Sequence, residues 1–205
     1  MKKVLVFIAA CCMATPLISQ KITVTNGSVD FVKNQKVLQF AFTYENMTVG
    51  NMTETRYVEK KVSDYNTKEP GRGDRWQEAW RGDREGRFVP KFKELFDKNM
   101  EDYGIVSDDV NNQNAEYRIE INTDFTEPGF NVGVVRRNAA IHLTCKVFNI
   151  ATGEEAATIK VNNASANNFW GTDFDTGFRI QECYAKAGRE LAKFFVKKAK
   201  LSKTK

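Results

Sequence analysis

Two aspartates near the C-terminal end of the sequence are the residues best suited to chemistry. Asp173 and Asp175 stand two positions apart, just after Phe169 and Trp170. Two carboxylates held about 5 to 10 Å apart in a cleft can act as the acid and base of a glycoside hydrolase. A simpler interpretation is that Asp175 or Thr176 caps the helix that follows, while the aromatic rings close the end of the core. The segment therefore supports either a carbohydrate-active or other hydrolase, or a purely structural role.

Other catalytic and metal-binding arrangements find no support. His142 is the only histidine, so neither a zinc ligand set nor a serine–histidine–aspartate triad can be assembled. No phosphate-binding glycine loop is present. The spacing around Asp173 is similar to a calcium loop, but Gly177 and Tyr184 stand where ligands are needed. We predict no catalytic residue, no metal and no cofactor.

The arginine-rich segment 71–84 carries two tryptophans that could contact a partner. Trp76 and Trp80 are one helical turn apart, which predicts a helix with both rings on one side. The tripeptide Arg-Gly-Asp occurs twice here, at 72–74 and 81–83. Integrins recognise this tripeptide in an exposed, flexible loop, so a packed helix argues against adhesion.

The first residues have the pattern of a secretory signal. Two lysines precede an apolar run that Pro16 ends shortly before Ser19. The run is too short for a permanent membrane anchor and has signal-peptide length. We expect residues 1–19 to be a cleaved signal peptide. The alternative is a lipoprotein signal, in which an acylated Cys11 becomes the new amino terminus.

Export would leave Cys145 and Cys183 as the one candidate disulfide, because the other two cysteines lie in the signal. Disulfides persist in oxidising compartments, but they need close Cα atoms that a sequence does not reveal. Both cysteines fall on faces expected to be buried. Two inert thiols in the core are therefore the favoured interpretation.

The composition suits one folded domain with a mild positive charge. The chain has 205 residues, 41% of them hydrophobic, and a formal charge of +5. Much of this charge lies in a lysine-rich C-terminal end. So mild a bias in an exported protein argues against nucleic acid as a partner. We expect membrane contact only through a lipidated Cys11 or the basic C-terminus.

Periodicity predicts strands, then helices, in the first half of the chain. Strands are expected at 22–25 and 29–32, joined by an Asn26-Gly27 hairpin turn, and at 37–44. A capping box of Asn51 and Glu54 predicts the start of a first helix. A second helix should open at Asp74, and a third should run from Pro90 to a stop at Gly104.

The second half predicts a hairpin and a long helix. Strands with period two are expected at 116–125, 141–147 and 157–161, the last two joined by a tight turn. A helix spans 180–195, where Gly188 implies close packing against the sheet. The fold class is therefore α+β: one mixed, mostly antiparallel sheet of about five strands, with helices, including the long C-terminal one, on one face. We expect residues 20–205 to form a single domain with a helical insertion at 53–87.

One family resemblance rests on the hairpin and its neighbours. Residues 148–154, FNIATGE, are similar to a strand, Asp-x-x-Thr-Gly-Glu, strand hairpin, although Asn149 stands where aspartate is usual. With the helix 92–103 and the strand 116–125, this resembles the periplasmic domains of curli-secretion-channel-like and penicillin-binding-protein-activator lipoproteins. Residues 42–50 and the insertion resemble uncharacterised secreted proteins of Gram-negative anaerobes. The resemblance implies an envelope address and no activity.

These observations predict a non-enzymatic exported module, periplasmic or associated with the outer membrane, that binds a protein or an envelope polymer. The alternative is a carbohydrate-active or other hydrolase that uses the loop carboxylates. The predicted contact surface consists of Phe169, Trp170, Asp173, Asp175, Trp76 and Trp80.

Overall fold

The computed structural model describes residues 20–109, 114–132, 135–165 and 175–204. The predicted signal peptide 1–19 with Cys11 lies outside these residues. So do three members of the predicted contact surface, Phe169, Trp170 and Asp173. The predictions for the signal peptide, Cys11, Phe169, Trp170 and Asp173 therefore stay predictions.

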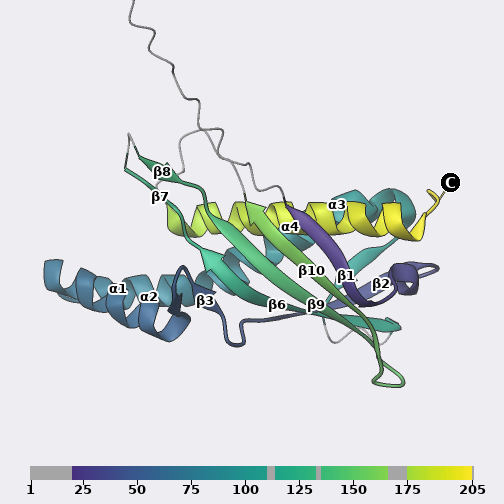
Figure 1. Cartoon of the computed structure of the whole chain (residues 1–205), viewed down its shortest axis with the longest axis horizontal. Coiled ribbons are helices and arrows are strands. Elements are labelled where there is room, and N and C mark those ends of the chain that lie inside the picture. The colour runs from purple at the N-terminus through teal and green to yellow at the C-terminus, as the bar shows by residue number, and fades with distance from the viewer. Residues whose placement is uncertain (1–19, 110–113, 133–134, 166–174, 205) are drawn as a thin grey trace, which may run out of the picture.

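The fold is built on one mixed sheet (Figure 1). Its order is β1 (Lys21–Gly27), β10 (Glu155–Ser165), β9 (Ala140–Asn149), β6 (Tyr117–Glu127), β2 (Val37–Thr43) and β5 (Val106–Asp108). The short strands β3 (Thr48–Val49) and β4 (Met52–Thr53) extend it to eight strands, so the expected number of about five was too low. The additional strands β3, β4 and β5 are too short for period two to reveal them. A separate two-stranded ribbon joins β7 (Phe130–Asn131) to β8 (Arg136–Arg137).

Strand direction divides the sheet into two parts. The pairs β1–β10, β10–β9 and β9–β6 are antiparallel, and β9 and β10 form the predicted hairpin. β2 instead runs parallel to both of its neighbours, β6 and β5. The α+β class and the mixed sheet are thus confirmed.

A bulge in β6 changes the expected alternation of its side chains. Ile119, Ile121 and Thr123 are buried as predicted. The register shifts between Thr123 and Phe125, after which Thr126 is the buried residue. Strict period two over 116–125 would bury Phe125 as well, but its ring instead packs 4.9 Å from that of His142.

The predicted N-terminal hairpin is wrong. Residues Val29–Val32 form a 3₁₀ helix, η1, whose first turn is capped by the Ser28 side chain accepting from the Asp30 N–H at 3.1 Å. β1 pairs with β10 and ends at Gly27, which has φ +69°. Burial of Phe31 against Phe195 in the C-terminal helix, with ring centroids 5.5 Å apart, favours the helical turn.

Four helices position the rest of the described chain: α1 (Glu54–Lys68), α2 (Arg72–Asp83), α3 (Val89–Met100) and α4 (Thr176–Ala199). α1 is capped by Thr53, not Asn51, and α2 follows Gly71 in place of the expected Asp74. Gly71 has φ +78°, which lets the chain reverse between the two helices. A π-helical turn, η2 (Arg84–Phe88), joins α2 to α3.

The start and stop predicted for the third helix are confirmed. Pro90 lies in the first turn of α3, and Gly104, with φ +65°, follows the short 3₁₀ turn η3 (Glu101–Tyr103) that ends it.

The helices occupy two places (Figure 1). α3 and α4 pack against each other, and α4 also packs on β9 and β10. Gly188 makes its close approach to α3 and not to the sheet, since a Cβ there would lie 2.2 Å from the Phe92 carbonyl oxygen. α1 and α2 form a hairpin that extends past the end of the sheet (Figure 1).

The candidate disulfide is absent. Cys145 in β9 and Cys183 in α4 form no disulfide, and both are fully buried. The Cys183 thiol donates to the Arg179 carbonyl oxygen at 3.3 Å, and burial raises the pKa of Cys145 to about 12. Both behave as the inert core thiols favoured from sequence.

Candidate functional site

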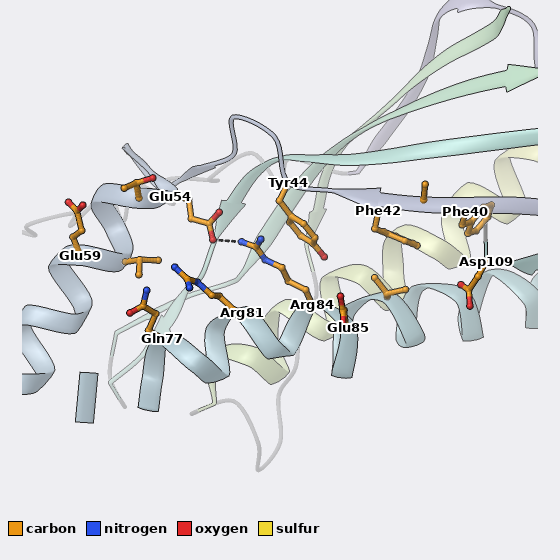
Figure 2. A pocket seen from close by; sticks show the side chains of 14 residues that line it. Phe40, Phe42, Tyr44, Glu54, Glu59, Gln77, Arg81, Arg84, Glu85 and Asp109 are labelled. Carbon is orange, nitrogen blue, oxygen red and sulfur yellow. Dashed lines mark hydrogen bonds and ion pairs between the residues drawn. The ribbon is translucent and has the colours of Figure 1, made fainter. Parts of the chain in front are cut away.

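A cleft of about 970 Å³ opens between β2 and the helices α1, α2 and η2 (Figure 2). One wall is the stretch of β2 and its continuation that includes Phe40, Phe42 and Tyr44. The other walls carry most of the charge. Its charged residues are Glu54 and Glu59 from α1, Arg81 from α2, Arg84 and Glu85 from η2, and Asp109 after β5.

Glu54, at the first position of α1, fixes one end of the cleft. Its carboxylate accepts from the Trp80 indole N–H at 2.7 Å and forms an ion pair with Arg84. Both ion-pair side chains are about three-quarters buried, with exposures of 22% and 23%. Charge-assisted hydrogen bonds in such surroundings are stronger than those on an open surface. The contacts therefore tie the start of α1 to the α2–η2 junction.

Arg84 also packs on an aromatic ring. Its guanidinium carbon lies 4.0 Å from the centre of the Tyr44 ring, a cation–π arrangement. Burial raises the pKa of Tyr44 to about 12, with neighbouring charges and the Tyr184 hydroxyl modifying the shift. Tyr44 therefore stays protonated at physiological pH and serves as a platform for Arg84.

Arg81 is the cleft's available cation. Among the described residues its guanidinium has no ion-pair or hydrogen-bond partner, whereas Arg84 is paired with Glu54. Gln77, Arg81 and Arg84 follow one another at helical spacing, which places them on one side of the helix. Figure 2 shows Gln77 and Arg81 on the side that faces Glu54. Arginine in this position can donate to carbonyl or carboxylate oxygens of a ligand.

The predicted tryptophan surface is wrong for Trp80. That side chain is only 7% exposed and packs in the core, while Trp76 is half-buried and stacks on it at 5.6 Å. Tyr57 of α1 packs against both rings. Trp80 therefore acts on the cleft indirectly, through its bond to Glu54. The two Arg-Gly-Asp tripeptides lie in helix α2, as the packed-helix interpretation required.

Asp175 is the one predicted loop carboxylate that the structure describes, and it caps α4. It accepts from the Phe178 N–H at 3.1 Å and from Arg87 at 3.2 Å. Partial burial opposes ionisation, but these hydrogen bonds outweigh it and lower the pKa of Asp175. Its carboxylate is thus committed to structure. The hydrolase hypothesis stays a prediction, since its other carboxylate, Asp173, lies outside the described residues.

Asp83 shares Arg87 with Asp175. The Asp83 carboxylate lies 3.0 Å from Arg87. Burial, with the negative charge of Asp175 added, nevertheless raises the pKa of Asp83 above its ordinary value, against the effect of Arg87. The cluster joins the end of α2 to the start of α4.

Metal binding finds no support among the described residues. No three of their histidine, cysteine and acidic side chains come together in a way that could hold a metal. His142 packs on Phe125, and partial burial lowers its pKa. No helix in the described part of the chain has the length and apolarity needed to cross a membrane.

Sequence reasoning missed the cleft residues, although a signal was present. Gln77, Arg81 and Arg84 recur at the spacing of one helical face within the segment already noted for its tryptophans. The pattern reveals a polar face. It does not reveal that this face meets β2 and not solvent.

The fold and the cleft together define an α+β domain with a charged cleft beside its sheet. No family model matches the chain, and no curated protein matches it. Solved structures with some similarity include PelC from Paraburkholderia phytofirmans, described as a dodecamer, at 12% identity and TM-score 0.38 over 82% of this chain and 97% of that one. A point variant of the same protein gives 12% and 0.37 over 82% and 96%.

A DUF330 protein from Xanthomonas campestris gives 10% identity and TM-score 0.38 over 80% of this chain and 86% of that one. Similarity at this level transfers no property of these proteins to the present chain. The resemblance to curli-secretion-channel-like and penicillin-binding-protein-activator domains is not addressed by these matches and stays a prediction.

Proposed function

We propose that this protein is a non-enzymatic exported module that binds a component of the cell envelope through the cleft beside β2. The observation that carries the proposal is the construction of the cleft. The ion pair between Glu54 and Arg84 holds the cleft's elements together. Arg81 and Glu59 line the cleft as charged residues outside that pair. Ligand sites commonly combine an apolar lining with a few placed polar groups, and this cleft has both.

Binding suits the cleft better than catalysis because Glu54, its most buried carboxylate, is already engaged in structural contacts. Glu54 accepts hydrogen bonds from the Trp80 indole and the Arg84 guanidinium, and these contacts hold its carboxylate in place. Tyr44, with its pKa near 12, is equally unsuited to act as a base at neutral pH.

The envelope address rests on the sequence. The lysines and apolar run at the amino terminus are typical of an export signal. A mildly basic domain without nucleic-acid motifs fits a partner in the envelope, protein or polymer. Lipidation at Cys11 would place the module on a membrane, and mass spectrometry of the mature chain distinguishes that case from cleavage near Ser19.

Site-specific photocrosslinking tests the binding site. A photoreactive amino acid replaces Glu59 at the cleft wall in one variant and Lys160, exposed on β10, in another. Each variant is produced in the native host and irradiated there. We expect a discrete crosslinked component from position 59 and none from position 160. Equal products from both positions, or none from position 59, would reject the cleft as the binding site.

A further inference from the structure

In the described part of the chain, the cleft runs along a stretch of β2 that has a neighbouring strand on one side only. β5 pairs with β2 only over Val37 to Gln39. On its other side β2 pairs with β6 from Gln39 to Thr43. Beyond Gln39, the side of β2 that β5 would cover has no strand beside it among the described residues. This open edge lies where Phe40, Ala41 and Phe42 line the cleft.

The backbone direction along this edge follows from one hydrogen bond. The Val106 N–H donates to the Lys36 carbonyl oxygen at 3.0 Å, so Lys36 directs its backbone groups toward β5. Strand geometry has period two, so Phe40 and Phe42 direct theirs toward the same side. The last pair, Gln39 with Asp108, ends the ladder. Past it, neither Phe40 nor Phe42 is paired with a described residue of β5.

The rest of the cleft matches the shape of a missing strand. From Phe40 to Tyr44 the open edge is ~13 Å long at the usual strand rise. Residues on α2, η2 and the start of α3, namely Arg81, Glu85 and Val89, line the opposite wall. Lys93 pairs with Asp109 at 2.8 Å where β5 stops, and the Glu54–Arg84 pair lies among the residues at the α1 end. Figure 2 shows this order from Asp109 past Glu85 to Glu54.

Charge indicates which peptides fit. Glu54 is paired with Arg84 and Asp109 with Lys93, which leaves Glu59 and Glu85 against Arg81. The uncompensated charge of the lining is therefore acidic. Apolar surface comes from Phe42, Val58 and Val89. A strand that alternates apolar and basic side chains would meet both features at once.

We propose that the cleft binds an extended polypeptide segment that continues the line of β5 and hydrogen-bonds to the open edge of β2. The proposal rests on the proposed function, because it takes the cleft as the binding site and names the partner class. Strand addition of this kind draws its affinity from main-chain hydrogen bonds and its specificity from alternate side chains. Apolar side chains of the segment lie against Phe42 and Val89, and basic ones reach Glu59 and Glu85.

A competing explanation is that the charges around the edge only protect it. Natural sheets place charged residues beside exposed edges to prevent pairing with other chains. Protection predicts that no peptide adds to β2. Strand addition predicts binding that depends on the peptide's own backbone N–H groups, and this difference can be measured directly.

The probe is a capped heptapeptide alternating valine and lysine, with two modified versions. One version carries N-methyl groups on the valines and the other on the lysines. In a strand, residues of one set point their N–H groups to one edge and those of the other set to the opposite edge. We expect one methylated version to lose affinity by roughly tenfold or more, the effect of one to two net hydrogen bonds, while the other binds like the parent.

Calorimetric titration of the purified protein gives these affinities. One variant changes the charge of the cleft, and a second, matched variant serves as its control. Glu85→Lys should weaken the parent peptide, whereas Lys160→Glu, on the far strand β10, should not. Equal binding by all three peptides, or no binding by the parent peptide, would overturn strand addition. Crosslinking from position 59 would still stand in either case if the proposed function is right, so the two failures are distinguishable.

Discussion

Glu54 is the residue on which the geometry of the cleft depends most. It accepts from Trp80 and pairs with Arg84, which in turn lies on the Tyr44 ring. Removing one partner from a mostly buried, charge-assisted contact leaves the other unsatisfied. The whole arrangement should therefore respond to a change at this one side chain.

Replacing Glu54 by glutamine should lower the free energy of unfolding by about 1–3 kcal/mol, because Arg84 loses its counter-charge in a partly buried position. Urea denaturation measures this as a lower midpoint with an unchanged slope. Glu94→Gln is the matched control, since its pair with Lys91 is on the surface and its side chain is 58% exposed. That variant should change stability by less than about 1 kcal/mol. Equal effects of the two substitutions would contradict the account.

The two aspartates that share Arg87 should respond to pH in opposite directions. The lowered pKa of Asp175 means that its charge stabilises the fold above its unfolded pKa and that this contribution is lost as pH falls. Asp175→Asn keeps a capping side chain but removes the negative charge. It should therefore destabilise the protein at pH 7 and have little effect at a pH where wild-type Asp175 is protonated.

The raised pKa of Asp83 means that its charged form is disfavoured by folding. Asp83→Asn should therefore be neutral or stabilising at pH 7, and its advantage should shrink as pH falls through the range where Asp83 binds a proton. Thermal unfolding from pH 3 to pH 7 compares both variants with the wild-type protein. If Asp83→Asn lost as much stability at pH 7 as Asp175→Asn, the opposite pKa directions given to the two aspartates would be wrong.

Among the elements, the junction of α3 and α4 has the least room for change. A Cβ at Gly188 would lie 2.2 Å from the Phe92 carbonyl oxygen. Gly188→Ala should therefore cost about 1–3 kcal/mol through forced separation of the helices, although alanine is the better helix former. Gly82→Ala in α2 is the control, because nothing lies within 4 Å of the added methyl group. It should be neutral or stabilising by up to about 1 kcal/mol. Calorimetry measures the unfolding temperature of each variant, which should fall for Gly188→Ala and stay equal or rise for Gly82→Ala.

Elements with long, regular patterns were predictable from the sequence, and short ones were not. β9, β10, α3 and α4 each bury a clear period-two or helical stripe, and all four were expected. η1 was mistaken for a strand because four residues with three apolar side chains fit either structure until Phe31 is seen against Phe195. The bulge in β6 likewise has no signal in composition, since it depends on pairing with β9.

At the scale of the whole molecule, the site lies where the sheet, the helical hairpin and α3 meet. Sequence reasoning found the right segment, 71–84, but chose its tryptophans over its arginines. Trp80 faces the core and Arg81 the cleft, and only the docking of α2 beside β2 distinguishes the two faces. The open edge of β2 was beyond prediction, because it arises where β5, three residues long, stops.

Charge reversal at the cleft wall should remove binding without unfolding the protein. Glu59 and Glu85 are exposed, so the double variant Glu59→Lys, Glu85→Lys should change the free energy of unfolding by less than about 1 kcal/mol. For this experiment the photoreactive residue is placed at position 55, which also lies at the cleft wall. The double charge reversal should lower the yield of the native crosslinked component severalfold. Circular dichroism confirms that the fold is kept. An unchanged yield would mean that Glu59 and Glu85 do not contact the partner.

Hydrogen exchange on the full mature protein, with and without the component captured by crosslinking, tests the central claim most directly. We predict that slowed amide exchange is concentrated in residues 40–44 and 77–89, which border the cleft, and that the Phe42 amide is among the most protected. Slowed exchange confined to β1 and β10, or to the β7–β8 ribbon, would contradict the account by placing the partner on another surface.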